Sequence, residues 1–149
     1  MEKDAALKKI LHYCAYQDRS FFEVETKLKS FEITDEERKS IIETLENESF
    51  IDDGRFARSF VRSKIDLKKW GANKIRLALK AKGIADDIIK DALSEIDDES
   101  YVESLRKILS SKKINENDPL RRKAKLAACG IQKGYPLAMV LKAIRDLNL

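Results

Sequence analysis

The sequence predicts an all-α protein, built as an elongated, curved array of three tandem three-helix repeats. Apolar residues recur at helical spacing along the chain without strand-like alternation. Only five glycines and two prolines interrupt its 149 residues, which favours long helices. Apolar positions also coincide three times when the sequence is shifted by 51 residues. Because stacked units bury their apolar faces against their neighbours, we expect an extended body, with a single compact bundle as the alternative.

The repeat is visible as four full columns of apolar residues in one register. The columns are Val24, Ile75 and Leu126; Ile33, Ile84 and Tyr135; Ile42, Leu93 and Ile144; and Leu45, Ile96 and Leu147. Any amphipathic helical chain gives partial matches of this kind, but four columns in one register favour true repetition. The predicted repeats are residues 1–50, 51–96 and 97–149.

Each repeat shows the start and stop signals of three helices. In the first repeat, Ser20 and Thr34 are expected to cap the second and third helices, and Thr34 has capping-box spacing to Glu37. In the third repeat, Asp118 precedes a proline at the first helical position. Gly134 is expected to end that helix, and Pro136 starts the last one.

The second repeat opens with an acidic pair, Asp52 and Asp53, for which two interpretations exist. The pair could belong to a metal-dependent nuclease, but acids at a helix start are more often caps that suit the helix dipole. Gly71 is expected to break the chain, and Gly83 to end the helix that follows it. The side chains expected to face the core from the first helix include Phe56, Phe60 and Leu67.

Charge is distributed unevenly along the chain. Residues 1–50 carry 8 cations and 12 acids, whereas residues 51–96 and 97–149 each carry 11 cations and 7 acids. Residues 54–82 hold ten cations against Asp66 alone. So concentrated a charge is costly in self-repulsion unless a polyanion is usually near, although a solvated helix face remains the alternative. The basic stretch is therefore the candidate binding surface.

Helical spacing places several of these cations together. Arg55, Arg58 and Arg62 share one face, and Lys74 begins the next helix. Trp70, the only tryptophan, would either stack on a base or fill a junction between repeats. The candidate contacts are Arg55, Arg58, Arg62, Lys68, Lys69, Trp70, Lys74, Arg76, Lys80 and Lys82, with Arg121 and Arg122 as a second patch in the third repeat.

No recognised catalytic or metal-binding pattern stands out. Cys14 and Cys129 are solitary, His12 is the only histidine, and no phosphate-binding glycine loop is present. We therefore expect no enzymatic activity, no cofactor and no metal. The chain lacks a long apolar run and its first residues lack a signal-peptide core, so a cytoplasmic protein is expected. We also expect a monomer.

One segment resembles the RecX family, modulators of the RecA recombinase in bacteria. Residues 50–64, FIDDGRFARSFVRSK, are followed at 68–84 by KKWGANKIRLALKAKGI. The pattern is an acidic pair, an aromatic with alanine, a basic run, a glycine, an apolar helix and Lys-Gly-Ile. It is carried here by Asp52, Asp53, Phe56, Ala57, Arg58, Arg62, Gly71, Ile75, Leu79, Lys82, Gly83 and Ile84. The likeness covers about residues 48–95; Lys133-Gly134-Tyr135 stands where the family often has Arg-Gly-Phe.

The resemblance implies tandem three-helix units and a regulatory function without catalysis. Proteins of this kind bind RecA, lie in the groove of its filament on DNA, and inhibit filament extension, ATP hydrolysis and strand exchange. They thereby modulate recombination, DNA repair and the SOS response. The implied partners are the RecA filament and, weakly and non-specifically, single- and double-stranded DNA. A stand-alone helix-turn-helix-like DNA-binding protein is the main alternative, and a helical scaffold for another acidic partner is a third.

Overall fold

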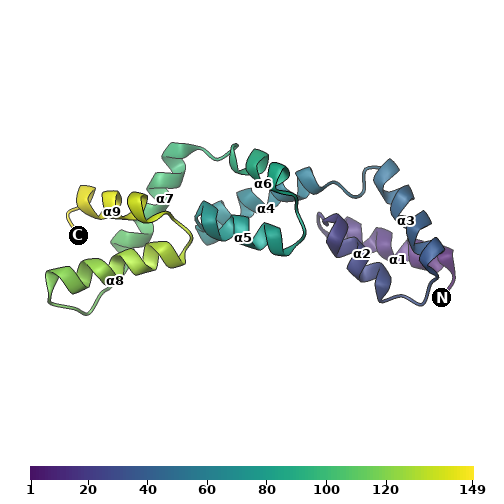
Figure 1. Cartoon of the computed structure of the whole chain (residues 1–149), viewed down its shortest axis with the longest axis horizontal. Helices are drawn as coiled ribbons and strands as arrows, with labels where there is room; N and C mark the ends of the chain where they lie inside the picture. The colour runs from purple at the N-terminus through teal and green to yellow at the C-terminus, as the bar shows by residue number, and fades with distance from the viewer. The chain divides into compact units, whose positions relative to one another are not determined.

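The computed structural model describes residues 1–149 and contains nine α-helices and no strand (Figure 1). They are α1 (Lys3–Tyr16), α2 (Phe21–Lys29), α3 (Asp35–Asn47), α4 (Asp53–Lys68), α5 (Ala72–Ala81), α6 (Asp86–Leu93), α7 (Asp98–Ser111), α8 (Pro119–Gln132) and α9 (Leu137–Asp146). Three helices fall within each predicted repeat, which confirms the all-α, three-helix architecture. The curvature of the array stays a prediction. No helix is both long enough and apolar enough to span a membrane.

Contacts between residues divide the chain into two compact units. The first unit is Met1–Ser59 with Leu79–Ala92, and the second is Phe60–Ala78 with Leu93–Leu149. The division passes through α4, α5 and α6, so the middle repeat contributes to both units. The repeat boundaries at residues 50 and 96 stay a prediction.

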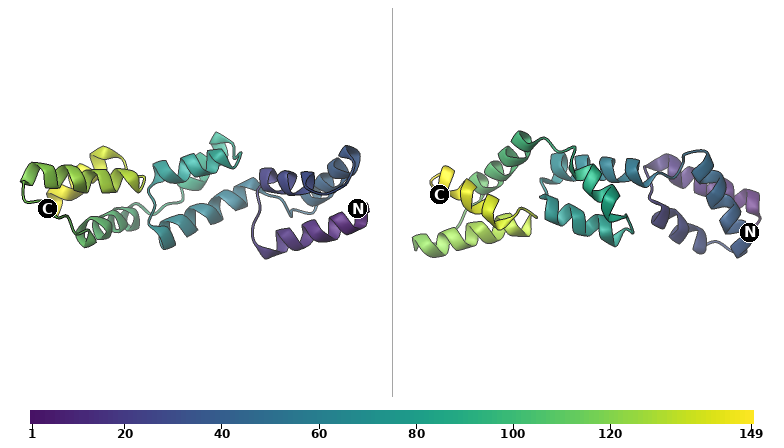
Figure 2. Two further views of the ribbon diagram at one scale, coloured as in Figure 1. Left: turned by 90° about the horizontal axis from the view of Figure 1, so that it is seen from below. Right: turned by 45° about the horizontal axis from the view of Figure 1, so that its top comes forward.

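Each unit is built around its own three-helix core. In the first unit α2 packs against α1 and α3, and in the second α9 packs against α7 and α8 (Figures 1 and 2). The column of Val24, Ile75 and Leu126 is fully or almost fully buried in all three repeats. The repeated apolar pattern therefore marks equivalent core positions.

One expected core residue lies elsewhere. Phe56 is buried, as expected, but Leu67 is 77% exposed. Leu67 occupies the last turn of α4, just before Lys69 takes a positive φ of 55° and the chain leaves the helix. Helical spacing identifies the face of a helix, but it does not tell whether a neighbour extends as far as its final turn.

The helix ends follow the sequence signals. Ser20 and Thr34 each form a complete capping box, and Asp118 accepts a hydrogen bond from the backbone N–H of Arg121 at 2.9 Å. Gly83 and Gly134 follow α5 and α8 with φ of 79° and 106°, a region that glycine enters without strain. These predicted boundaries are confirmed.

The acidic pair caps two different helices of the first unit. Asp52 Oδ1 accepts a hydrogen bond from the backbone N–H of Arg55 at 3.0 Å, at the start of α4. Asp53 Oδ1 accepts one from the backbone N–H of Phe21 at 2.8 Å, at the start of α2. Because both carboxylates satisfy helix N-termini, the capping interpretation of the pair is confirmed.

A tight junction in the second unit joins the start of α5 to the turn between α8 and α9. The N–H of Gly71 donates to the Lys133 carbonyl at 2.7 Å, and that of Asn73 to the Gly134 carbonyl at 3.0 Å. A Cβ on Gly71 would lie 2.3 Å from the Gly134 carbonyl carbon. Only glycine permits this approach of two backbones.

Two tyrosines complete this α5 junction. Tyr101 Oη accepts a hydrogen bond from the Ala72 N–H at 2.8 Å, and Tyr135 Oη donates to the Lys69 carbonyl at 3.0 Å. Their ring centroids lie 4.9 Å apart. Burial raises the pKa of both hydroxyls above the usual tyrosine value, so both remain protonated well above neutral pH.

A related junction occurs in the first unit, 51 residues earlier in the chain. There Gly83 packs against Phe22 in the first turn of α2, and a Cβ on Gly83 would lie 3.2 Å from the Phe22 Cβ. In the second unit a Cβ on Gly134 would lie 2.5 Å from the Cβ of Lys74, in the first turn of α5. The turn after one repeat's second helix thus meets the start of the preceding repeat's second helix in both units.

The Tyr101→Phe variant should lower the free energy of unfolding by about 1–3 kcal/mol, because the N–H of Ala72 loses its acceptor in a partly buried place. Chemical denaturation followed by circular dichroism measures this change. Tyr16→Phe is the matched control. Because Tyr16 is 81% exposed, loss of its hydroxyl should leave the free energy of unfolding nearly unchanged. Equal stability of the two variants would contradict this account of the junction.

Candidate functional site

The candidate contact residues, eleven basic side chains and Trp70, divide between the two units. Those in the first unit are Arg55, Arg58, Lys80 and Lys82; those in the second are Arg62, Lys68, Lys69, Trp70, Lys74, Arg76, Arg121 and Arg122. The second unit therefore holds most of the predicted contacts. Which of them are available to a partner depends on the interactions that each side chain already makes.

Some of these cations have internal partners. Arg55 Nε lies 3.2 Å from Asp18 Oδ1, and the same guanidinium donates to the carbonyls of Ser49 and Phe50. Arg55 thus ties the start of α4 to the α1–α2 loop and to the α3–α4 loop. Lys80 pairs with Asp86 at 3.4 Å, but both side chains are largely exposed, so this pair is weak.

Other cations on and after α4 make no ion pair. Arg62 and Lys68 are exposed, and Arg58 is half-buried on the same helix, one turn before Arg62. None of the three lies within salt-bridge distance of an acid. Uncompensated surface charge of this kind attracts a polyanion.

Trp70 lies between α4 and α5 and packs within the second unit. Its ring meets Phe60 edge-on, with centroids 6.4 Å apart. The Lys64 and Lys74 ammonium groups lie 4.9 Å and 4.5 Å from its ring centroid. Cation–π attraction therefore holds two cations beside one half-buried aromatic ring. This geometry is typical of a packing residue that also positions charge.

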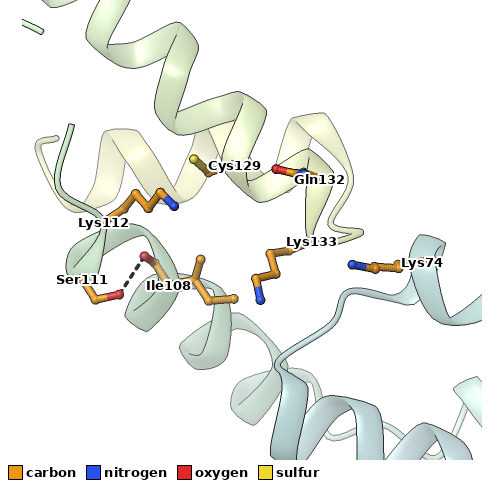
Figure 3. Close-up of a pocket in the computed structure, with 7 residues that line it drawn as sticks. All are labelled: Lys74, Ile108, Ser111, Lys112, Cys129, Gln132 and Lys133. Atoms are coloured by element: carbon orange, nitrogen blue, oxygen red, sulfur yellow. Dashed lines mark hydrogen bonds between the residues drawn. The ribbon is translucent and has the colours of Figure 1, made fainter. Parts of the chain in front are cut away.

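A pocket of about 450 Å³ opens beside Lys74 in the second unit (Figure 3). It is lined by Lys74, Ile108, Ser111, Lys112, Cys129, Gln132 and Lys133. In the close-up, Lys112 and Lys74 reach toward Lys133 from either side. No acid lines the pocket, and none of the three lysines forms an ion pair, so their charges favour an anion such as a phosphate.

Sequence reasoning missed two of these three lysines. Lys112 follows α7 and Lys133 ends α8, so only folding brings them beside Lys74. Lys82-Gly83 recurs 51 residues later as Lys133-Gly134. This recurrence marks an equivalent turn in the two repeats, and it could have pointed to Lys133 as a candidate contact. Nothing in the local sequence singles out Lys112. The predicted patch at Arg121 and Arg122 does not line the pocket.

No chemistry beyond charge is apparent in the arrangement. No group of three or more His, Cys, Asp or Glu side chains is placed to hold a metal ion. Cys14 and Cys129 are free and half-buried, and burial raises the pKa of the Cys14 thiol, which makes it less reactive. The property that the site does show is positive charge without acidic partners, which favours an anion.

Comparison with known proteins identifies the family. A family profile described as "RecX, second three-helix domain" matches residues 52–93. A relative from Prosthecochloris aestuarii, named Regulatory protein RecX, is 30% identical over 142 residues, which make up 95% of this chain and 93% of the relative. This chain belongs to the RecX family.

Other RecX proteins agree with this assignment. A relative from Lactobacillus johnsonii is 40% identical over 71% of this chain, but that match spans only 39% of the relative. The crystal structure of RecX from Lactobacillus salivarius has a TM-score of 0.88 at 28% identity and covers 98% of this chain and 96% of that one. A second RecX crystal structure, with a TM-score of 0.86, is 29% identical and covers 97% and 71%.

The RecX profile covers the part of the chain that carries most of the candidate site. Residues 52–93 contain α4, α5 and α6 and every candidate contact between Arg55 and Lys82. Arg121, Arg122 and the pocket lysines Lys112 and Lys133 lie outside that match. The relatives carry the name of a regulatory protein, so the family context indicates regulation.

Proposed function

We propose that this RecX-family chain binds the RecA recombinase and RecA–DNA filaments and inhibits filament extension, ATP hydrolysis and strand exchange. It would thereby modulate recombination, DNA repair and the SOS response in the cytoplasm, without catalysis or a cofactor of its own. The observation that carries the proposal is membership of the RecX family along nearly the whole chain. The unpaired cations of the second unit supply a physical means of binding.

The second unit presents its free charge in a form suited to a filament on DNA. Arg62, Lys68 and the three pocket lysines form no ion pair, so no carboxylate of the chain must be displaced before an anion binds. Lysine and arginine that neutralise phosphates release counterions, and acidic protein surface would satisfy the same side chains. Complementary charge mainly speeds association and sets orientation.

The proposal predicts inhibition of RecA-catalysed ATP hydrolysis on single-stranded DNA. Adding the chain should lower the hydrolysis rate in a concentration-dependent manner, and raising salt should increase the concentration needed for half-inhibition, since phosphate contacts weaken steeply with salt. A coupled assay of ADP release measures both effects. The chain incubated without RecA provides the control for any hydrolysis of its own. Undiminished hydrolysis at saturating chain would contradict the proposal.

A further inference from the structure

A second pocket, in the first unit, combines aromatic and basic side chains. It has a volume of about 470 Å³ and is lined by Lys9, His12, Tyr13, Tyr16, Arg19, Lys27 and Phe31. These residues come from the second half of α1, the turn after it, and α2 with the residues that follow it. Pockets of roughly 300–1,000 Å³ hold small organic groups. None of its lining residues is among the contacts predicted from the sequence.

The pocket has a charge opposite to that of its surroundings. Residues 1–50 carry 12 acids against 8 cations, yet three of those cations and no acid line the pocket. Many acids of this repeat are engaged elsewhere, in ion pairs or helix caps; these are Asp18, Glu23, Glu25, Asp35 and Glu37. Because the cations line the pocket and the acids lie elsewhere, the local potential at the pocket is positive although the repeat as a whole is acidic.

The aromatic side chains of the pocket are already arranged around cations. The Arg19 guanidinium lies 3.7 Å from the Tyr13 ring centroid, and its Nε donates to the Tyr13 carbonyl at 2.9 Å. Lys27 Nζ lies 5.6 Å from the same centroid. These two contacts hold the Arg19 side chain against Tyr13 in the lining of the pocket. The Arg19 guanidinium also lies 5.9 Å from the Tyr16 ring centroid, but Tyr16 is 81% exposed, so most of this side chain faces solvent.

We propose that this pocket binds a nucleotide of single-stranded nucleic acid, with the base stacked on Tyr16 and the flanking phosphates held by Lys9 and Lys27. An exposed aromatic ring beside a positive groove is the combination that binds single strands without sequence preference, because every base has a π-face. The site lies in the first unit and does not require RecA. It therefore goes beyond the proposed regulatory function.

Two other classes of ligand fit the pocket less well. A carboxylate-rich peptide would gain from Lys9, Arg19 and Lys27 but would leave the exposed Tyr16 ring unused. Duplex nucleic acid keeps its bases stacked inside the helix, so no base face is available to Tyr16. Only an unpaired nucleotide uses both the charge and the ring.

The first test is crosslinking of the full chain, without RecA, to a thymidine oligonucleotide that carries 5-iodouracil. Ultraviolet irradiation joins this base to an aromatic side chain stacked on it, and mass spectrometry of peptides locates the bond. We expect a crosslink at Tyr16, and its loss in the Tyr16→Ala variant. Crosslinks confined to residues 60–78 would overturn the proposal.

The second test measures affinity for a thymidine oligonucleotide by fluorescence anisotropy. Tyr16→Ala should weaken binding about tenfold, whereas Tyr16→Phe, which keeps the ring, should stay within about twofold of the parent. Phe50→Ala is the matched control, because Phe50 is 44% exposed in the same unit and lies outside the pocket. Circular dichroism verifies that each variant is folded.

Two results of the affinity measurement would overturn this assignment. One is an unchanged affinity of Tyr16→Ala for the oligonucleotide. The other is equally tight binding of an abasic oligonucleotide of the same length, which would mean that phosphates alone are recognised. Because neither measurement involves RecA, both can succeed or fail independently of the proposed regulation of the filament.

Discussion

Gly134→Ala is expected to lower the free energy of unfolding by about 3 kcal/mol or more, through strain and overlap together. Gly134 has a φ of 106°, which residues with a Cβ rarely adopt. An added Cβ would also lie 2.5 Å from the Cβ of Lys74 and 2.7 Å from its backbone nitrogen. The nitrogen belongs to the first turn of α5 and cannot move alone, so the α5 junction must open. Urea denaturation measures the change.

Gly54→Ala is the matched control for this substitution. Gly54 lies in the first turn of α4, and an added Cβ would meet mainly the flexible end of Arg58, at 3.1 Å. Alanine is a better helix former than glycine by about 1 kcal/mol, so this variant should be as stable as the parent or slightly more stable. If Gly134→Ala were as stable as Gly54→Ala, the close approach at the α5 junction would be refuted.

Reversing four unpaired cations of the second unit is expected to reduce RecA inhibition at least about tenfold, because each substitution turns an attraction for phosphate or acidic protein into a repulsion. The four changes are Arg62→Glu, Lys68→Glu, Lys74→Glu and Lys112→Glu. Arg62, Lys68 and Lys112 are exposed and Lys74 contacts only the Trp70 ring through its ammonium group, so the fold should survive. The concentration of chain that halves ATP hydrolysis is the measured quantity.

The control variant carries the same change in net charge at other exposed sites. Its substitutions are Lys8→Glu, Lys39→Glu, Lys90→Glu and Lys107→Glu, all at exposed positions outside the candidate site. It should retain inhibition within about threefold, because non-local charge is largely screened at physiological salt. Equal loss in both variants would mean that net charge, rather than this surface, determines the inhibition.

Local signals in the sequence were sufficient for the helix ends. A capping box at Thr34 and Glu37 and glycines at positions 83 and 134 each act within a few residues, so their effect can be predicted without the fold. The apolar columns identified the core for a similar reason, since helical period determines which face is buried. The RecX motif then predicted the family correctly.

Other features depend on parts of the chain far apart in sequence. The acidic pair was expected to cap the helix that it begins, and Asp52 does so, but Asp53 instead caps α2, 32 residues earlier. Lys112 and Lys133 approach Lys74 only because the α8–α9 turn docks on the start of α5. The exposure of Leu67 likewise depends on how far its neighbours extend. Local residue patterns contain no direct record of such long-range placement.

The most direct test of the regulatory account compares binding of the chain to RecA–single-stranded DNA filaments, to RecA alone and to the DNA alone. Fluorescence anisotropy of the chain labelled at its N-terminus gives the three affinities over a range of salt concentrations. We expect the tightest binding to the filament, with a salt dependence that is reduced in the variant reversed at Arg62, Lys68, Lys74 and Lys112. Filament binding no tighter than binding to DNA alone, or unaffected by those four reversals, would contradict it.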